Sequence, residues 1–427
     1  MLLARFLDAV IKTGDLCITD AAGTTHRFGD GDGVPVGIRL HDRATEWRML
    51  LNPKLAVGEA YMNGKLTVET GTLCDFLDLA ARNLEAIETH RLQSVLGIAE
   101  RLLRYVRMYN PIGKAQRNVA HHYDLSDELY ALFLDEDRQY SCAYFNRPGM
   151  SLEEAQLEKK RHIAGKLRLD RPGLRALDIG SGWGGMALYL VQQGAQTVKG
   201  VTLSVEQHKV SERRARDADL ADRVSFALQD YREDTGTYDR IVSVGMFEHV
   251  GAGHYLEYFT KVRGLLAEDG VFLLHSIGRM EPPGGRDPWI DKYIFPDGYV
   301  PALSETLAAI ERSGLWVTDI EILRLHYAET LRHWYERFQE RRAAAHALYD
   351  ERFCRMWEYY LAACEMMFRN GTLMVFQVQL AKERDAVPLT RDYLYSDPRK
   401  GHPHWADEAL NERVESETVP LRVGECV

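Results

Sequence analysis

The sequence lacks long apolar runs, and no stretch approaches the roughly 18–20 uninterrupted apolar residues that a membrane-spanning helix needs. Near the N-terminus, Asp8, Lys12 and Asp15 come too early for the apolar core of a secretory signal. Cysteine is also scarce: the chain has six in 427 residues, without metal-ligand spacing. We therefore expect free thiols, no metal site and a soluble cytoplasmic protein.

The chain also has no excess of positive charge. Its 53 Lys and Arg against 63 Asp and Glu give a formal net charge of −10. Because phosphate contacts need a basic face, nucleic acid is not expected as a partner. The apolar share of 45% is that of a globular protein. At about 100–200 residues per domain, the length predicts two or three domains.

Residues 1–90 mix strand-like runs with turn clusters, which predicts a small α+β domain. The glycine- and aspartate-rich turn at 29–33 leads into a predicted strand at 34–38, and the run 46–51 is also predicted to be strand-like. Over 91–120, apolar residues recur at spacings of three and four, as on an amphipathic helix. Its opposite side is basic and carries Arg101, Arg104, Arg107, Lys114 and Arg117. Such a helix either lies on an anionic membrane or links two domains with a solvated face.

Residues 121–385 are predicted to form an α/β domain with a doubly wound, mostly parallel sheet, because short apolar runs alternate there with helical stretches. The segment 335–368 is predicted to be helical, and 373–378 is a late strand. Residues 386–427 are a polar C-terminal tail, predicted as loop or disorder. The main predicted strands are 175–179, 197–202, 224–228, 240–244 and 270–274.

A glycine-rich segment lies where the first of these strands ends. Gly180, Gly182, Gly184 and Gly185 give the spacing G-x-G-x-G-G, not the G-x-G-x-x-G of dinucleotide-binding loops. Glycines there let the backbone turn sharply and approach a cofactor closely. Asp178 would repel a pyrophosphate but could hold an ammonium group. The pattern favours S-adenosylmethionine over NAD or ATP; a tight turn without a ligand is the alternative.

The next two strands supply further candidate cofactor contacts. The second strand ends at Thr202, where many such enzymes place an acid on the ribose hydroxyls, and Gln207 could bind the ribose instead. Asp230 and Tyr231 follow the third strand and could flank the adenine. Each of these residues has a structural explanation that is at least as good when it is taken alone.

Four motifs in order closely resemble those of the cyclopropane-fatty-acid synthases and the related mycolic-acid methyltransferases. The similarity covers most of the chain, from about residue 50 to about 369, and includes the segment 58–64. Ser181 departs from the family, which usually has Cys there. The four motifs are YSCAYF at 140–145, LDIGSGWGG at 177–185, MFEHVG at 246–251 and HSIG at 275–278.

The resemblance implies a Rossmann-like fold of the class I S-adenosylmethionine-dependent methyltransferases with a smaller N-terminal α+β domain. It implies transfer of a methyl group to the cis double bond of a phospholipid acyl chain, then proton loss and ring closure. The implied cofactor-binding residues are Tyr140, Ser141, Asp178, Gly180, Gly182, Trp183, Gly184, Thr202, Leu203, Gln207, Asp230 and Tyr231.

The resemblance further implies that a bound bicarbonate is the base. Its implied ligands are Cys142, Glu248, His275, the backbone N–H of Ile277, and Tyr327. From the residues alone, Glu248 and His275 each follow a predicted strand end, where parallel sheets present functional groups. Cys142 taken alone is better explained as a small buried apolar residue.

Several alternatives stay open at the level of sequence. The enzyme could stop at a methyl- or methylene-branched chain, methylate a small molecule on O or N, or be a lipid-binding protein that has lost its chemistry. The expected partner is a phospholipid bilayer, met peripherally at the inner face of the membrane. A homodimer is a further option that the sequence does not decide.

Overall fold

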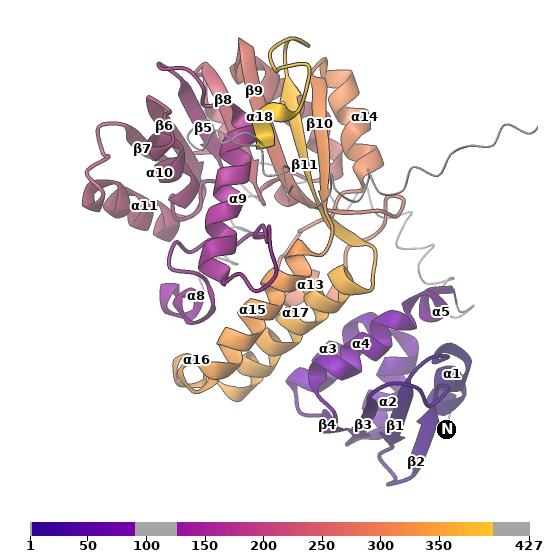
Figure 1. Cartoon of the computed structure of the whole chain (residues 1–427). Helices are drawn as coiled ribbons and strands as arrows, with labels where there is room; N and C mark the ends of the chain where they lie inside the picture. Colours follow the sequence, from indigo (N-terminus) through magenta and orange to yellow (C-terminus); the bar gives the residue numbers. More distant parts are fainter. Residues whose placement is uncertain (1, 90–125, 396–427) are drawn as a thin grey trace, which may run out of the picture. The chain divides into compact units, whose positions relative to one another are not determined.

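A computed structural model describes residues 2–89 and 126–395 of the chain (Figure 1). Residues 1–386 form one compact unit, and Val387–Val427 form a second. The predicted basic helix at 91–120 lies outside the described residues, and the domain boundaries stay predictions. In the second unit, the short helix α18 (Asp392–Tyr395) occurs where the sequence predicted loop or disorder. No helix within the described ranges is both long and apolar enough to cross a membrane.

The N-terminal part, residues 2–89, has a four-stranded sheet in the order β2-β1-β3-β4, covered by helices. This confirms the predicted α+β fold, but the strand predicted at 46–51 is wrong. Those residues belong to helix α2, because Asp42 caps it by accepting the N–H of Thr45, and only Thr45 and Met49 face the core. The elements are α1 (Leu2–Val10), β1 (Asp15–Thr19), β2 (Thr25–Phe28), β3 (Pro35–Leu40), α2 (Arg43–Leu51), α3 (Pro53–Met62), β4 (Leu66–Thr70), α4 (Leu73–Arg82) and α5 (Leu84–Thr89).

The larger sheet has seven strands in the order β10-β11-β9-β8-β5-β6-β7. Strands β5 to β9 run parallel, and β11 lies antiparallel between β9 and β10, so the predicted mostly parallel sheet is confirmed. The strands are β5 (Arg175–Ile179), β6 (Thr197–Thr202), β7 (Val224–Leu228), β8 (Tyr238–Val244), β9 (Leu266–Arg279), β10 (Trp316–Leu323) and β11 (Leu373–Ala381).

Strand β9 is much longer than predicted, and this moves His275. The sequence placed His275 after a strand end, but it lies inside β9. The strand continues to Arg279 because β11, which is about a hundred residues away in the chain, pairs with it along its whole second half. His275 is nevertheless the last residue of β9 that pairs with β8, at Val244.

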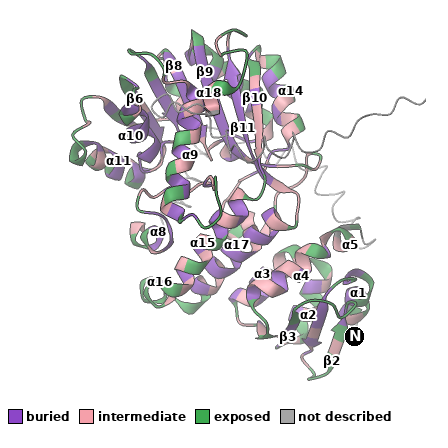
Figure 2. Cartoon of the chain, in the orientation of Figure 1, coloured by how far each residue is buried: buried purple, intermediate pink, exposed green. Residues whose placement is uncertain are grey.

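Helices cover both faces of the larger sheet, as the doubly wound prediction requires (Figure 2). Successive strand residues alternate between the two cores: Ile241 packs with α12 and α14, whereas Val242 packs with α9 and α10. This alternation explains why the strands are apolar throughout. The covering helices are α9 (Leu152–Leu167), α10 (Gly185–Gln192), α11 (Val205–Asp217), α12 (Tyr255–Leu265) and α14 (Leu303–Ser313).

The region predicted as one helical segment, 335–368, spans parts of three helices. The chain breaks between α16 and α17, where Asp350 caps α17 by accepting the N–H of Phe353. Helices α15 and α17 lie side by side around buried aromatic side chains such as Trp334 and Trp357 (Figure 1). The remaining helices are α8 (Asp127–Phe133), α13 (Pro288–Tyr293), α15 (His326–Glu340), α16 (Arg342–Leu348) and α17 (Glu351–Arg369). The 3₁₀ turns within residues 2–89 and 126–395 are η1 (Tyr231–Glu233), η2 (Phe247–His249) and η3 (Ala252–His254).

Candidate active site

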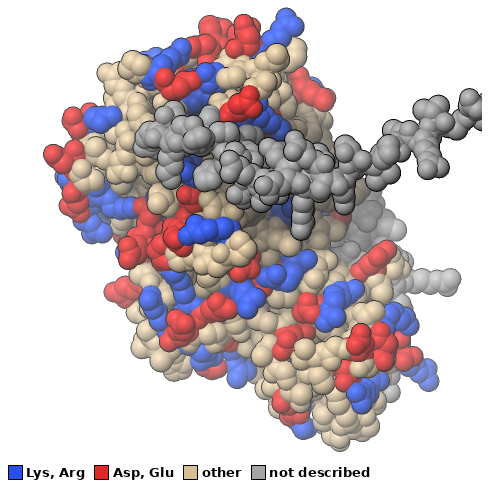
Figure 3. Space-filling model, viewed as in Figure 1, with Lys and Arg blue, Asp and Glu red and all other residues tan. Residues whose placement is uncertain are grey.

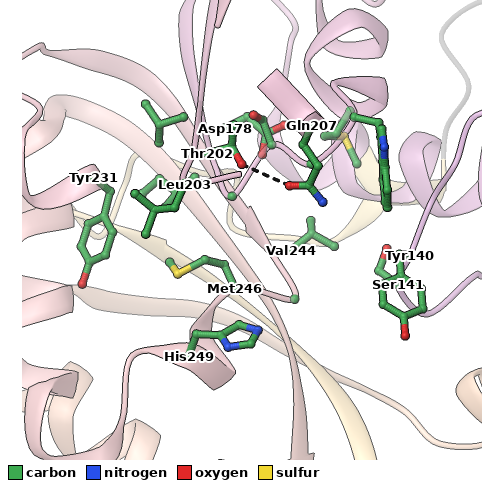
Figure 4. Close-up of a pocket in the computed structure, with 18 of the residues that line it drawn as sticks. Tyr140, Ser141, Asp178, Thr202, Leu203, Gln207, Tyr231, Val244, Met246 and His249 are labelled. Carbon is green, nitrogen blue, oxygen red and sulfur yellow. Dashed lines mark hydrogen bonds between the residues drawn. The ribbon is translucent and has the colours of Figure 1, made fainter. Parts of the chain in front are cut away.

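A cavity of about 160 Å³ opens at the carboxyl ends of β5, β6, β7 and β8. Its walls are the loop that follows each of these strands and the segment 138–141 before α9. Figure 4 shows Tyr140 and Ser141 on one side of this cavity and Tyr231 on the other, with Met246 and His249 between them. This is the edge where open α/β sheets bind their ligands.

Two glycines keep the wall of the cavity open. Gly182 has φ +54° and Gly245 has φ +68°, and a Cβ added at either would meet no described atom within 4 Å. Gly180 is restricted differently, since its Cβ would lie 2.8 Å from Cβ of Met246. Gly184 does not line the cavity: a Cβ there would lie 2.7 Å from the ring of Phe226, so this glycine lets α10 pack closely.

Asp178 presents a buried carboxyl group at the floor of the cavity. Burial raises its pKa to about 7, and its Oδ2 has no hydrogen-bond partner among the described residues. Nearby, the hydroxyl of Thr202 donates to Oε1 of Gln207 at 3.1 Å (Figure 4). These groups supply an acceptor and an amide at the predicted ammonium and ribose positions.

The turn after β7 is held by an arginine that sequence reasoning missed. The Asp230 carboxylate accepts two bonds from the side chain of Arg232, at 2.9 and 2.7 Å. Tyr231 packs edge-on against Tyr258, with 5.3 Å between the ring centroids. Asp230 therefore fixes the turn, while Tyr231 lines the cavity.

The segment 138–141 is fixed from behind by a buried lysine. Nζ of Lys159 donates to Oγ of Ser141 at 2.8 Å and to Oε1 of Gln139 at 2.5 Å. The lysine is fully buried, and burial lowers its pKa to about 8. Tyr140 is anchored separately, because its hydroxyl lies 2.8 Å from that of Tyr360.

Glu248 lies in η2, between the cavity-lining residues Met246 and His249, and is itself buried. Its Oε1 accepts the backbone N–H of Ile277 at 2.7 Å. Its Oε2 is buried without a partner in the described part of the chain. Burial raises the pKa of this carboxyl to about 7.

His275 lies on the neighbouring strand β9 and is also buried. Burial, together with the positive charges of Lys159 and Lys166, lowers its pKa to about 3, so the ring is neutral at pH 7. Its Nδ1 lies 3.1 Å from Nε2 of Gln377 on β11. A buried neutral imidazole and a buried carboxyl of raised pKa are both groups suited to proton chemistry.

The other two implied bicarbonate ligands belong to one aromatic core. Cys142 and Tyr327 are both buried there, and Ile277 packs against it. The Cys142 thiol donates to the carbonyl of Ala143 at 3.3 Å, and burial raises its pKa. The Tyr327 ring packs on Phe368, with 4.8 Å between centroids.

All the predicted cofactor residues except Gly184 line the cavity, whereas none of the five implied bicarbonate ligands does. Met246 and His249 flank Glu248 in the motif MFEHVG, so their position after a strand end could have identified them. Arg232 and Gln229 had no such signal. The lining residues that the sequence missed are Arg138, Gln139, Ile179, Ser181, Met186, Val201, Gln229, Arg232, Val244, Gly245, Met246, His249, Val250 and His254.

A family model for mycolic acid cyclopropane synthetase matches residues 112–378, and a domain of unknown function matches residues 12–90. The chain belongs to the mycolic acid cyclopropane synthetase family. The cyclopropane-fatty-acyl-phospholipid synthase of Escherichia coli K12 is 38% identical over 356 residues, or 82% of this chain and 88% of that protein. A probable fatty acid methyltransferase of Pseudomonas putida is 40% identical over 288 residues, or 65% of this chain and 73% of that protein.

Solved structures of this family agree with the sequence comparison. A cyclopropane synthase of Mycobacterium tuberculosis superposes with a TM-score of 0.60 and 35% identity, covering 64% of this chain and 99% of that one. A mycolic acid cyclopropane synthase in complex with SAH and CTAB gives a TM-score of 0.59 and 34% identity over 64% and 99% of the two chains. The predicted family and fold are confirmed, and the chain is an S-adenosylmethionine-dependent methyltransferase of this synthetase family.

Proposed function

We propose that this methyltransferase converts the cis double bond of a phospholipid acyl chain into a cyclopropane ring. The observation that carries the proposal is the placement of Glu248, a buried carboxyl between two residues of the cofactor cavity. An apolar lipid chain needs such a dry site, and the relative in Escherichia coli is named for this reaction.

The cavity fits S-adenosylmethionine, which when bound supplies an electrophilic methyl group from its sulfonium. Oδ2 of Asp178 has no partner in the described residues, so it is available to a cationic or hydroxyl group of the cofactor. Gly182 and Gly245 leave the space that the cofactor needs. Gln207 and Tyr231 would contact the ribose and the adenine.

An alkene cannot be activated by removing a proton, so the chain must align the double bond with the methyl group and exclude water. The cationic carbon that results can be stabilised by an aromatic face. Tyr140 is the best placed, since it lines the cavity and packs on Phe295 at 6.5 Å between centroids. Phe247 is less suited because it is fully buried among Tyr255, Tyr258 and Phe259.

Ring closure requires loss of one proton, for which a bound bicarbonate would supply the base. Oε2 of Glu248, which lacks a described partner, can accept the bicarbonate O–H, and neutral His275 can donate to the anion. We propose that Ile277 acts by holding Glu248, since its N–H already reaches Oε1. Cys142 and Tyr327 complete the proposed ligand set.

We further propose that the enzyme works at a phospholipid surface on the inner face of the membrane. On the face shown in Figure 3, acidic and basic side chains are interspersed. We propose that the basic residues of 91–120 provide the attraction to anionic lipid. This attraction would weaken with salt over a Debye length of about 8–10 Å. Binding to anionic vesicles should fall as ionic strength rises; equal binding to neutral vesicles would contradict this role. A homodimer is compatible with the proposal but not required by it.

Lipid analysis of cells that express the chain tests the reaction itself. We expect unsaturated acyl chains to become heavier by one CH₂ and to resist ozone, because a cyclopropane has no double bond to cleave. Products that ozone cleaves would indicate a methylene branch, and saturated products would indicate a methyl branch. Unchanged lipids would overturn the lipid proposals and leave small-molecule methylation.

A further inference from the structure

Gln377 on β11 lies directly opposite His275 on β9. The two residues are partners in the antiparallel register of these strands, and both are buried, Gln377 with no exposed surface. Nε2 of Gln377 lies 3.1 Å from Nδ1 of His275. A residue 102 positions away in the chain therefore sets the environment of one nitrogen of the ring.

The orientation of the amide decides which way the hydrogen bond runs. With its NH₂ toward His275, Gln377 leaves only Oε1 without a described partner. The group of Gln377 that faces Nδ1 of His275 is its NH₂, which can only donate a hydrogen bond. Nδ1 of His275 is thus the acceptor, and in a neutral imidazole the proton must then lie on Nε2.

We propose that Gln377 is a positioning residue that holds neutral His275 with its proton on Nε2, so that the ring offers a fixed donor to the anionic base. This inference rests on the proposed bicarbonate site. An amide suits the task better than a carboxylate, which would require a proton on Nδ1 and would favour imidazolium. Among the surrounding charged groups, Lys159, Lys166 and His162 disfavour a charged ring, while Glu321 acts in the opposite sense.

The ring nitrogens can be observed directly by NMR of protein labelled with ¹⁵N-histidine, with the His275 signals assigned by their loss in His275→Ala. In the wild-type protein we expect a protonated Nε2 and an unprotonated Nδ1 that does not titrate near neutral pH. Gln377→Glu should place a proton on Nδ1 and raise the pKa of the ring. Gln377→Met, which removes the bond but keeps the volume, should give a mixture of tautomers.

The matched control is Gln379→Met. Gln379 is a second buried glutamine on β11, and its Nε2 donates to the carbonyl of Lys166 at 2.6 Å. Gln379→Met should lower the free energy of unfolding about as much as Gln377→Met does, while leaving the His275 signals unchanged. In Gln377→Met we expect kcat to fall about 10–100-fold, as when the partner that orients a ligating histidine is lost, with little change in cofactor Kd.

A wild-type ring protonated on Nδ1 would overturn the inference, even if no Gln377 variant folds. Unchanged His275 signals in both Gln377→Glu and Gln377→Met would overturn it as well. The proposed function fails by a separate result, full turnover without bicarbonate, which would leave the NMR assignment as it is.

Discussion

The cofactor cavity opens at the ends of β5 to β8, whereas the two buried residues of the proposed base site, Glu248 and His275 (the buried pair), lie in η2 after β8 and in β9. The two regions are built in opposite ways. The cavity is formed by turns in which Gly182 and Gly245 leave open space. Side chains that line it, such as Tyr140 and Asp230, are held by hydrogen bonds to other residues. Glu248 in η2 and His275 in β9 are both buried, and Oε2 of Glu248 has no described partner. The cavity provides a space that a ligand can fill, whereas Glu248 and His275 provide groups whose protonation can change.

Burial acts on the two members of the pair in opposite directions but with the same result. It raises the pKa of Glu248 to about 7 and lowers that of His275 to about 3, so both groups are biased toward their neutral forms. Perturbed pKa values of this kind are typical of functional sites. Asp178 shares a property with each region. It lines the cavity, and burial raises its pKa to about 7, as it does for Glu248.

The largest effect should come from Glu248→Gln, which changes the pair without touching the cavity lining. We expect kcat to fall about 10²–10⁴-fold, the usual cost of losing one acid–base contribution, while cofactor Kd stays within about twofold. Steady-state kinetics and calorimetry on the same preparation measure both. Glu268→Gln, at an exposed residue, is the control. A defect confined to cofactor binding would remove Glu248 from the proposed chemistry.

A smaller effect should follow from Gly182→Val, which changes only the cavity. A branched residue at positive φ costs about 1–3 kcal/mol, and its side chain would fill cofactor space, so we expect Kd to rise about 10–100-fold. Calorimetric titration measures this change. Gly264→Ala on α12, where an added Cβ meets no described atom, should bind normally. Unchanged affinity in the Gly182 variant would refute the cofactor role of the loop.

The pH dependence of cofactor binding should sharpen the role of Asp178. Since its pKa is about 7, the charged form that attracts a cation is lost as pH falls through 7. Affinity should therefore drop about tenfold from pH 8 to pH 6, and Asp178→Asn should flatten this profile. Because burial holds the pKa of Asp178 in the folded protein above that of an exposed aspartate, ionising this carboxyl at high pH costs stability. The Asn variant without cofactor should thus have a higher Tm at pH 8, with a smaller difference at lower pH.

The smallest effect is expected for Gln207→Ala. The loss of one hydrogen bond to the ribose is worth about 0.5–1.5 kcal/mol, so Kd should rise roughly 2–10-fold. Titration of the variant with SAH measures this change in Kd. Gln192→Ala, at an exposed residue of α10, is the control. An affinity equal to that of the wild type would mean that Gln207 only supports Thr202.

The sequence predicted well what depends on neighbouring residues. The bounds of β5, β6 and β7 match the predicted strands, because each is a short apolar run between turns. The sequence-based prediction failed where the structure depends on contacts between segments that are far apart in the chain. Strand β9 is extended by β11, and the Gln377–His275 pair depends on the same pairing.

The cavity followed the same rule. The spacing of the glycine loop identified its position, but the role of Gly184 depends on the ring of Phe226 from another strand. Arg232 could not be found because its pairing with Asp230 resembles any charged turn. The implied bicarbonate ligands came from motif resemblance, since nothing in their spacing indicates that β8 and β9 bring Glu248 and Ile277 together.

The most direct test of the central claim, that a buried base site works separately from the cofactor cavity, is to measure turnover and cofactor Kd together while bicarbonate is varied. In buffer freed of carbon dioxide, we predict that turnover is low, rises with added bicarbonate and saturates, while Kd for the cofactor does not change. Full turnover without bicarbonate, or a change in Kd that accounts for the whole activation, would contradict the claim.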